Sequence, residues 1–327
     1  MKIAIVGITG VVGETIVRVL DERKVPCDEL GAFASRARTE PFVFRGREYP
    51  IRAASRDALV TGGYDVVFFA SSDDASAELA QACVDAGARV IDNSATFRLT
   101  DGVPLVVPEV NPGAIGPGDR LFPVANCTAI VLVVAIAPIY RLAGLRSVRV
   151  ATYQAVSGAG RAGLEALEGE ELGRDVPTPF VAPIFRNVVP QVGSLDENGD
   201  SGEEKKVAAE TRKMLDAPEL HVAATTVRVP VRRAHSEAIF LETARDTSVA
   251  EIAEALRNAP GVVFHEQGVV TPRDVEDDDR VHVARLRAEG DSKRHFQLWA
   301  VGDQLRKGAA TNGVQILELL LERNVLV

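Results

Sequence analysis

Three cysteines are the residues in this sequence best suited to nucleophilic chemistry, and their contexts differ. Cys127 stands in Pro-Val-Ala-Asn-Cys-Thr, residues 123–128, just before an apolar run that predicts a helix over about residues 128–142. A thiol at a helix N-terminus meets the positive end of the helix dipole and free backbone N–H groups, which lower its pKa and offer an oxyanion site. Cys83 falls among Ala and Leu in a predicted helix, typical of a core residue, and Cys27 lies in a loop without a partner. Cys127 is therefore the candidate nucleophile, although most lone cysteines are structural.

A thiolate nucleophile needs a partner that handles protons, and the chain has five histidines. His235 follows a predicted strand that bears several cations, in Arg-Val-Pro-Val-Arg-Arg-Ala-His-Ser-Glu at residues 228–237. The other four histidines, His221, His265, His282 and His295, have no such cluster of cations beside them, and a surface or core role is the default for each. His235 is the candidate acid/base because of its combination with Cys127, not on its own merits.

A glycine turn near the N-terminus could bind the pyrophosphate of a dinucleotide. The spacing G-x-x-G-x-x-G over residues 7–13 falls between a predicted strand and a predicted helix, where glycines let backbone N–H groups approach phosphate. The second predicted strand ends in Ser35, Arg36 and Arg38 instead of the acidic residue that usually binds the NAD ribose. A hydroxyl and two guanidiniums suit a 2′-phosphate, which favours NADP over NAD. Taken alone, the first motif also fits a plain tight turn and the second a solvated basic turn.

Composition narrows the class of protein. A formal net charge of −9 argues against a nucleic-acid surface, and 46% hydrophobic with 25% charged residues is typical of a soluble protein. The longest apolar run, residues 129–139, is too short to span a bilayer, and the N-terminus lacks a signal-peptide pattern, so we expect a cytoplasmic protein. An odd number of cysteines without a Cys-x-x-Cys pair favours neither a disulfide framework nor a metal site.

Elements that could position these residues follow two patterns, and 327 residues suggest two domains. The first third alternates short apolar runs with helical stretches, which predicts a parallel sheet of βαβ units. Strands are expected at 2–6, 29–35, 66–70 and 89–93, and helices at 13–20 and 74–86. Longer alternating runs at 146–156, 222–231 and 237–243 predict a larger, partly antiparallel sheet, and charged loops are expected at 196–204 and 273–280 before a terminal helix at 306–323.

Several short motifs resemble the aspartate-semialdehyde dehydrogenase family nearly end to end. In chain order they are GITGVVG at 7–13, IDNSATFR at 91–98, VVPEVN at 106–111, ANCT at 125–128, TYQAVSGAG at 152–160, EEKK at 203–206, RVPVRRAHSE at 228–237 and RKGAATN at 306–312. Unrelated motifs that recur in one order are far more specific than any one of them.

The resemblance implies an enzyme that reduces L-aspartyl-4-phosphate with NADPH to L-aspartate 4-semialdehyde and phosphate, in the biosynthesis of lysine, threonine, methionine and diaminopimelate. It implies a Rossmann-like NADP-binding domain at residues 1–128, completed by a C-terminal helix at 306–327, and a catalytic and dimerisation domain on a mixed sheet at 129–305. The fold class is thus α/β plus α+β. A homodimer formed through the second sheet is also implied.

The resemblance also implies a role for each site residue. Cys127 would form the acyl thioester, and His235 would act as acid/base, assisting deprotonation of the thiol. Substrate and phosphate would be bound by Arg98 and Lys206 at the phosphate, Asn126 beside it, Arg228 and Glu203 at the α-carboxylate and α-amino group, and Gln154 near the thiol. NADP would contact Thr9, Gly10, Val11, Val12, Ser35, Arg36, Ser157, Gly158 and Gln304. An acyl phosphate brings two anionic groups, so several fixed cations make chemical sense.

Some of these residues have plainer interpretations, and some positions depart from the family. Glu203 and Lys206 are three residues apart and could face one pocket or form a solvated ion pair. Residues 70–74, Ala-Ser-Ser-Asp-Asp, replace a loop with paired glycines, which leaves cofactor contacts there open. Ala234 stands where relatives usually have Gly, and Gln304 occupies a position often filled by Asn or Gln.

Three other functions fit part of the pattern. An N-acetylglutamyl-phosphate reductase also uses a cysteine thioester, but its acetylated substrate needs no carboxylate such as Glu203. A non-catalytic paralogue has no reason to keep Cys127, His235, Arg98 and Arg228 together. A glyceraldehyde-phosphate dehydrogenase fits less well, because its cysteine and histidine motifs read differently.

Overall fold

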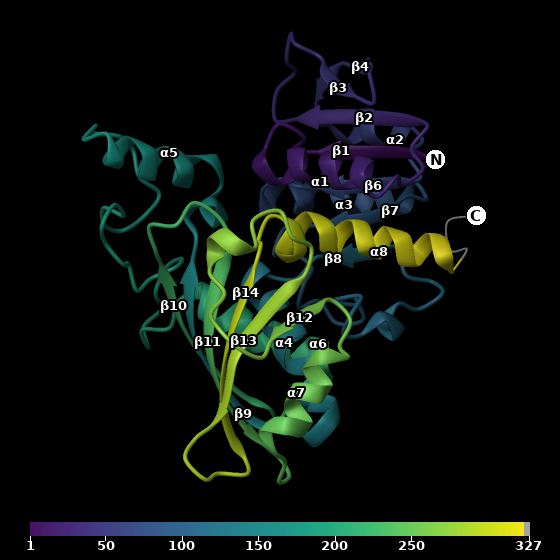
Figure 1. The fold of residues 1–327 in the computed structure, drawn as a ribbon. Coiled ribbons are helices and arrows are strands. Elements are labelled where there is room, and N and C mark those ends of the chain that lie inside the picture. Colours follow the sequence, from purple (N-terminus) through teal and green to yellow (C-terminus); the bar gives the residue numbers. More distant parts are fainter. Residues whose placement is uncertain (324–327) are drawn as a thin grey trace. The chain divides into compact units, whose positions relative to one another are not determined.

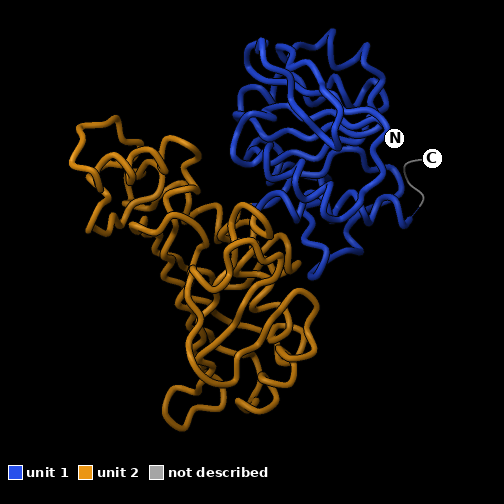
Figure 2. The backbone as a smooth tube through the Cα atoms, turned by 45° about the horizontal axis from the view of Figure 1, so that its top comes forward, with its two compact units in different colours: residues 1–125, 309–327 blue, residues 126–308 orange. Residues whose placement is uncertain are grey.

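The computed structural model describes residues 1–323, and the chain divides into two compact units. Unit 1 comprises Met1–Ala125 and Ala309–Val327, and unit 2 comprises Asn126–Gly308, as coloured in Figure 2. The chain passes from one unit to the other after residues 125 and 308, whereas the sequence predicted domain boundaries after residues 128 and 305. Asn126 and Cys127 therefore open the second unit.

Unit 1 is built on a parallel sheet, as expected from its short apolar runs. Its strand order is β5(Ile51–Ala53), β2(Glu29–Ala34), β1(Lys2–Val6), β6(Val66–Phe69), β7(Arg89–Asp92), β8(Leu121–Pro123). β1 lies centrally and pairs with both β2 and β6, so the order reverses there. Ligands of doubly wound sheets bind outside the carboxyl ends of the strands at such a point. The sheet is thus of the Rossmann type.

Helices cover this sheet and close its core. They are α1(Val11–Glu22), α2(Arg56–Thr61), α3(Asp73–Asp85) and α8(Thr311–Glu322), with a short hairpin of β3(Phe42–Phe44) and β4(Arg47–Tyr49) and a 3₁₀ turn at Pro112–Ala114. Ser72 caps α3 by accepting from the Ala75 N–H. The terminal helix α8 contacts α1 and β7, so the C-terminal segment completes unit 1 (Figure 1).

Unit 2 has a mixed sheet with a helical layer on one face. Its order is β10(His221–Arg228), β9(Leu145–Gln154), β11(His235–Thr243), β14(His295–Gly302), β13(Val281–Ala288), β12(Val262–His265). The helices are α4(Cys127–Ala143), α5(Gly160–Glu171), α6(Gly202–Leu215) and α7(Val249–Arg257), with 3₁₀ turns at Val156–Ala159 and Pro272–Asp274. α4 packs on β9, β11, β13 and β14 and contacts both α6 and α7.

Alternation along the central strands explains this one-sided packing. In β9, Val148, Val150 and Thr152 are buried, whereas Tyr153 is 38% exposed. Phe240 of β11 is likewise 42% exposed, and Tyr153 lies 5.4 Å from Trp299 between ring centroids. The sheet therefore buries one face beneath the helices and presents an aromatic-bearing face on the other side.

Two expectations are corrected by the structure. Residues 202–204 form the first turn of α6 and not a loop, because Ser201 and Glu204 make a reciprocal capping box. The expected terminal helix at 306–323 begins as a π-helical turn, Arg306–Ala310, before α8.

No helix among residues 1–323 is long and apolar enough to cross a membrane.

Candidate active site

Cys127 is the first residue of α4, and the residue before it fixes that helix end. The Asn126 side-chain oxygen accepts from the Thr128 and Ala129 N–H groups at 3.0 and 3.1 Å. The Asn126 backbone N–H donates to the buried Glu210 carboxylate at 2.5 Å. Because its oxygen caps the helix, Asn126 can contact a substrate phosphate only through its side-chain amino group.

His235 meets Cys127 across 108 residues of sequence. Its Nε2 lies 3.5 Å from the Cys127 Sγ, and its Nδ1 accepts from the Ala155 N–H at 3.1 Å. The ring is completely buried. Burial, and then the Arg228 guanidinium, hold the pKa of His235 well below its ordinary value of 6.5, so the imidazole is neutral.

The backbone before His235 is held in an unusual conformation. Ala234 has φ +68°, a left-handed value that glycine adopts without strain. Its N–H donates to the Gln304 side-chain oxygen at 2.8 Å, and the Gln304 amino group donates to the Ser157 hydroxyl. Ser157 donates in turn to the Arg232 carbonyl. Glycine would hold this φ without strain, and Gln304 supports the strand end that carries the imidazole.

A row of polar side chains continues from His235 across the carboxyl ends of the neighbouring strands. Arg228 of β10 pairs in register with Gln154 of β9. Gln154 donates to the Glu203 carboxylate at 3.1 Å, and Arg228 donates to the Ala155 carbonyl at 2.6 Å. Burial lowers the pKa of Arg228, while Cys127 and Glu203 oppose that shift, so both lie within its electrostatic range. A cation, a carboxylate and an amide therefore surround one end of the thiol site.

A cavity opens beside this row. It measures about 460 Å³, and Arg228 lines it together with Phe180, Val192 and Gly193. The Arg228 guanidinium carbon lies 5.7 Å from the centroid of the Phe180 ring. A small amino acid carboxylate would find a buried cation there.

The two cations expected at the phosphate lie in different units. Lys206 is half-buried on α6, one helical turn from Glu203. Among residues 1–323, no ion pair or hydrogen bond engages its ammonium group, which excludes the solvated Glu203–Lys206 pair. Arg98 belongs to unit 1, where its guanidinium donates to the Asn93 carbonyl at 2.8 Å and is largely buried.

Two glycines allow close approach of the reacting side chains. A Cβ added at Gly158 would lie 2.8 Å from an Arg228 guanidinium nitrogen and 3.2 Å from the His235 Nε2. One added at Gly308, inside the π-helical turn, would lie 3.0 Å from the Cys127 Cβ. Gly158 was expected as a cofactor contact, and the structure also places it against the imidazole and guanidinium. Gly308 was missed, although it lies within the RKGAATN motif.

The glycine turn of unit 1 contains Thr9, Gly10, Val11 and Val12. Gly7 has φ +89°, and an added Cβ would lie 2.2 Å from the Ala70 carbonyl oxygen. Gly10 begins α1 without a side-chain cap, so no side chain at that position competes for the first N–H groups of the helix. The loop that departs from the family, residues 70–74, thus packs against the turn through its backbone.

Ser35 and Arg36 follow β2 at the same sheet edge and are exposed. No acidic residue stands between Ala34 and Thr39. The expected 2′-phosphate contacts therefore lie on the surface beyond the carboxyl end of β2.

One buried acid was missed by sequence reasoning. Glu237 follows His235 on the same face of β11, and neither carboxyl oxygen has a hydrogen-bond partner among the described residues. Burial raises its pKa well above 4.5, so it is a neutral carboxylic acid. The His-Ser-Glu triplet contained this signal, because alternate residues of a strand share a face.

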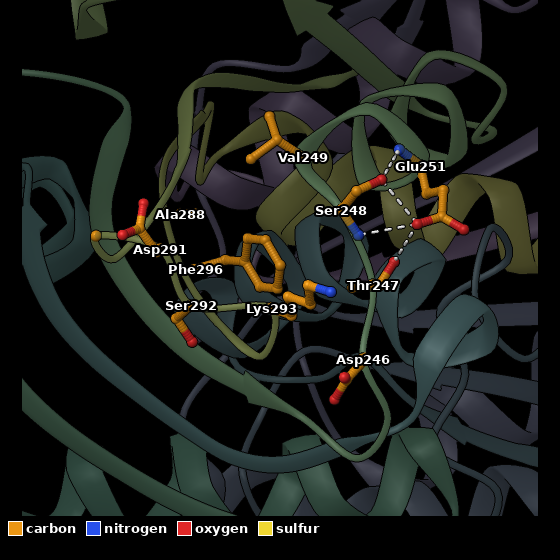
Figure 3. Close-up of a pocket in the computed structure, with 11 residues that line it drawn as sticks. Asp246, Thr247, Ser248, Val249, Glu251, Ala288, Asp291, Ser292, Lys293 and Phe296 are labelled. Atoms are coloured by element: carbon orange, nitrogen blue, oxygen red, sulfur yellow. Dashed lines mark hydrogen bonds between the residues drawn. The ribbon is translucent and has the colours of Figure 1, made fainter.

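A second cavity in unit 2 lies away from these residues. Figure 3 shows its lining side chains, which come from the segment before α7, the first turn of α7 and the β13–β14 hairpin. Its volume is about 440 Å³. Glu251 is engaged there by Ser248 and Thr247 in the capping box of α7, so the polar groups serve the helix end. Neither a cysteine nor a histidine lines this cavity.

Unit 1 has the fold of a nucleotide-binding domain, and unit 2 holds the Cys127 thiol against a buried imidazole. The class is that of nucleotide-dependent dehydrogenases. Family models agree in both units: the semialdehyde dehydrogenase NAD binding domain matches residues 2–117, and the semialdehyde dehydrogenase dimerisation domain matches residues 136–307.

Individual relatives identify the family more narrowly than the two family models do. The chain is 40% identical to an aspartate-semialdehyde dehydrogenase of Aquifex aeolicus, with 99% of each chain covered. It superposes with a TM-score of 0.93 and 36% identity on the crystal structure of aspartate semialdehyde dehydrogenase II complexed with ASA from Vibrio cholerae, covering 98% of each chain. A Candida albicans aspartate semialdehyde dehydrogenase with NADP matches at a TM-score of 0.77 and 25% identity, covering 99% of each chain. The chain belongs to the aspartate-semialdehyde dehydrogenase family, and its cofactor is a nicotinamide nucleotide.

Proposed function

We propose that the chain reduces L-aspartyl-4-phosphate to L-aspartate 4-semialdehyde and phosphate with NADPH, through a thioester on Cys127. The observation that carries the proposal is the 3.5 Å contact between the Cys127 sulfur and the buried imidazole of His235. A thiolate held there can attack the acyl carbon and expel phosphate. Reduced nicotinamide, when bound, supplies the hydride that converts the thioester to the aldehyde level.

Residues around the pair match the substrate group by group. Arg228 is a buried cation for the α-carboxylate, and Glu203, oriented by Gln154, is an anion for the α-amino group. Lys206 and Arg98 bind the phosphate, with the Asn126 amino group beside it. Fixed charges of this kind lower the barrier because they need no reorganisation during reaction.

NADP is the nucleotide in this proposal. Gly10, Thr9, Val11 and Val12 hold the pyrophosphate at the start of α1, where the helix dipole favours an anion. Ser35 and Arg36 bind the 2′-phosphate, and Ser157, Gly158 and Gln304 are the remaining proposed nucleotide contacts. In this proposal no metal takes part, and the reaction occurs in the cytoplasm.

A homodimer is the proposed assembly. The match to a dimerisation domain falls on unit 2, and the face of its sheet opposite the helices carries Tyr153, Phe240 and Trp299. An exposed aromatic-bearing sheet face is the kind of surface that a second copy can cover.

The first experiment is an assay in the reverse direction. It follows NADPH formation from L-aspartate 4-semialdehyde, phosphate and NADP, with N-acetylglutamate semialdehyde and NAD as parallel controls. Phosphate-dependent turnover of the free amino aldehyde is expected. Activity only with the acetylated aldehyde would move the chain to the rival reductase, and silence with every substrate would favour a non-catalytic paralogue.

A further inference from the structure

A buried hydroxyl on β9 is connected to the carboxylate proposed to bind the substrate's amino group. Thr152 lies two residues before Gln154, so the two side chains share one face of the strand, and both are buried. The Thr152 hydroxyl donates to the Gln154 side-chain oxygen at 3.0 Å. The Gln154 amino group donates to the Glu203 carboxylate at 3.1 Å. Thr152, Gln154 and Glu203 therefore form one row of hydrogen bonds.

Each hydrogen bond in this row has one direction. An ionised carboxylate only accepts, so the Gln154 amino group must face Glu203 and its oxygen must face Thr152. The Val227 backbone N–H donates to the Thr152 hydroxyl oxygen at 3.3 Å, which leaves the hydroxyl proton for Gln154. Turning the amide over would place its oxygen against the carboxylate. The row therefore fixes the amide in one orientation.

No other acceptor competes for the Thr152 hydroxyl proton. Glu237 lies opposite Thr152 in the register of β11 with β9, but neither of its carboxyl oxygens has a hydrogen-bond partner among the described residues. Within residues 1–323, the hydroxyl makes hydrogen bonds only with Gln154 and Val227. The single donor of Thr152 is thus directed at the Gln154 amide.

The backbone at Glu203 is held by different contacts. Glu203 lies in the first turn of α6, which begins with the capping box of Ser201 and Glu204. Glu204 also accepts from the Thr226 backbone N–H at 2.9 Å, so this helix end is attached to β10 without Thr152. Loss of the Thr152 hydroxyl would therefore release the Glu203 side chain while leaving its backbone in place.

We propose that Thr152 is a positioning residue that determines specificity for a free α-amino group, because it orients Gln154 and, through Gln154, the Glu203 carboxylate. The second Glu203 oxygen, Oε2, makes no hydrogen bond within residues 1–323 and can accept from a substrate ammonium group. A substrate whose amino group is acetylated or missing gains nothing from this arrangement. The inference rests on the proposed function and deepens it.

The first test uses neither substrate nor nucleotide. NMR follows the exchange of side-chain amides with D₂O in the full chain labelled with ¹⁵N-glutamine, and Gln154→Ala identifies the signals of residue 154. In the native chain and in Thr152→Ser, which keeps the hydroxyl, the Gln154 amide should exchange at least about tenfold more slowly than that of the exposed Gln267.

Thr152→Val keeps the shape of the side chain and removes the hydroxyl, so the Gln154 amide should exchange about tenfold faster than in the native chain. Native exchange in this variant would overturn the proposal. So would an amide of Gln154 that exchanges as fast as that of Gln267 in the native chain.

The second test compares two aldehydes in the reverse assay with phosphate and NADP. Succinate semialdehyde is L-aspartate 4-semialdehyde without the amino group. Thr152→Val should lower kcat/KM for the amino aldehyde by about tenfold, mostly through a higher KM, and should change kcat/KM for succinate semialdehyde by less than about twofold. Thr152→Ser should retain the native ratio of the two kcat/KM values.

Thr243→Val is the matched control. Thr243 is a completely buried residue at the opposite end of β11 from His235, and its hydroxyl donates to the Arg245 carbonyl. This variant should lose stability and keep the native ratio. Equal losses with both aldehydes in Thr152→Val would show a general structural role and overturn the proposal. A native chain that turned over neither aldehyde would contradict the proposed function, and the exchange experiment would still decide whether Thr152 orients Gln154.

Discussion

The glycine turn of unit 1 and the thiol site of unit 2 perform related tasks by different means. The turn is made by seven consecutive residues, 7–13, and its backbone groups are the ones proposed to bind the nucleotide. The thiol site gathers Cys127, Gln154, Arg228 and His235 from one helix and three strands, and its side chains are the ones proposed to do the chemistry. A local backbone structure fails when the chain cannot adopt its shape, whereas a dispersed site fails when one functional group is lost.

The largest expected effect tests the dispersed site. Cys127→Ala removes the nucleophile and should lower kcat by about 10⁴-fold or more, because no other described group can form the acyl intermediate. NADP affinity, measured by fluorescence titration, should stay near the native value. Substantial turnover in this variant would mean that the covalent route is wrong. Cys83→Ala, in the core of unit 1, is the matched control and should retain kcat while losing some stability.

The glycine turn at residues 7–13 is tested by the stability of the folded chain. Gly7→Ala combines a left-handed φ with a Cβ 2.2 Å from the Ala70 carbonyl oxygen, so we expect a loss of about 2–5 kcal/mol in the free energy of unfolding. Gly46 also has a positive φ, +73°, but no atom within 4 Å of an added Cβ. Gly46→Ala should therefore cost only about 1–2 kcal/mol by urea unfolding. Equal losses would show that the contact with Ala70 is unimportant.

Gly158→Ala should damage chemistry without unfolding the chain. The new methyl group would displace the Arg228 guanidinium or the His235 ring, and misplacement by about 1 Å costs about 10²-fold in kcat/KM. Gly118→Ala, where an added Cβ meets nothing within 4 Å, should leave kcat/KM unchanged. A native kcat/KM in Gly158→Ala would show that this glycine does not position the reacting side chains.

Glu237→Gln examines a buried group of the thiol site that no ligand is proposed to touch. The folded chain keeps Glu237 protonated, while in the unfolded chain this carboxyl ionises above about pH 4.5. The contribution of Glu237 to the free energy of unfolding therefore falls as pH rises. Between about pH 5 and about pH 8 the Gln variant should gain on the native chain by at most about 1.4 kcal/mol per pH unit. Urea unfolding at both pH values measures this, and a constant difference would mean that Glu237 ionises normally.

Ala234→Gly is expected to have the smallest effect. Glycine tolerates φ +68° without the Cβ strain of alanine, so the free energy of unfolding should rise by about 1 kcal/mol despite the greater entropy of glycine in the unfolded chain. Thermal unfolding would report the gain. A loss of stability would show that the strain at Ala234 is negligible.

Local features were predictable from sequence, and long-range ones were not. The bounds of β1 and the approximate bounds of α3 and α4 follow from apolar runs and their flanking Ser, Asn and Gly. The beginning of α6 was missed because acidic and glycine residues at 196–204 resemble a loop, although Ser201 and Glu204 signal a capping box. The fold class and family are confirmed by the comparisons, whereas the roles of individual site residues remain predictions.

The contacts that orient the site residues could not be predicted from the sequence. Nothing in the sequence connects Ala155 with His235, since their hydrogen bond spans 80 residues and depends on the register of β9 with β11. The cap made by Asn126 was open to prediction from its residue type, but its tie to Glu210 was not. Backbone donors carry no sequence signature, so this contact with the candidate acid/base could not be predicted.

The Cys127 sulfur is attached to a deeply buried helix of unit 2. α4 is seventeen residues long, most of them buried, and packs on four strands and two helices. Amides in such an element exchange with solvent mainly through global opening, so their hydrogen exchange should be among the slowest in the chain. We therefore expect heat to separate Cys127 from His235 only when the core of unit 2 melts.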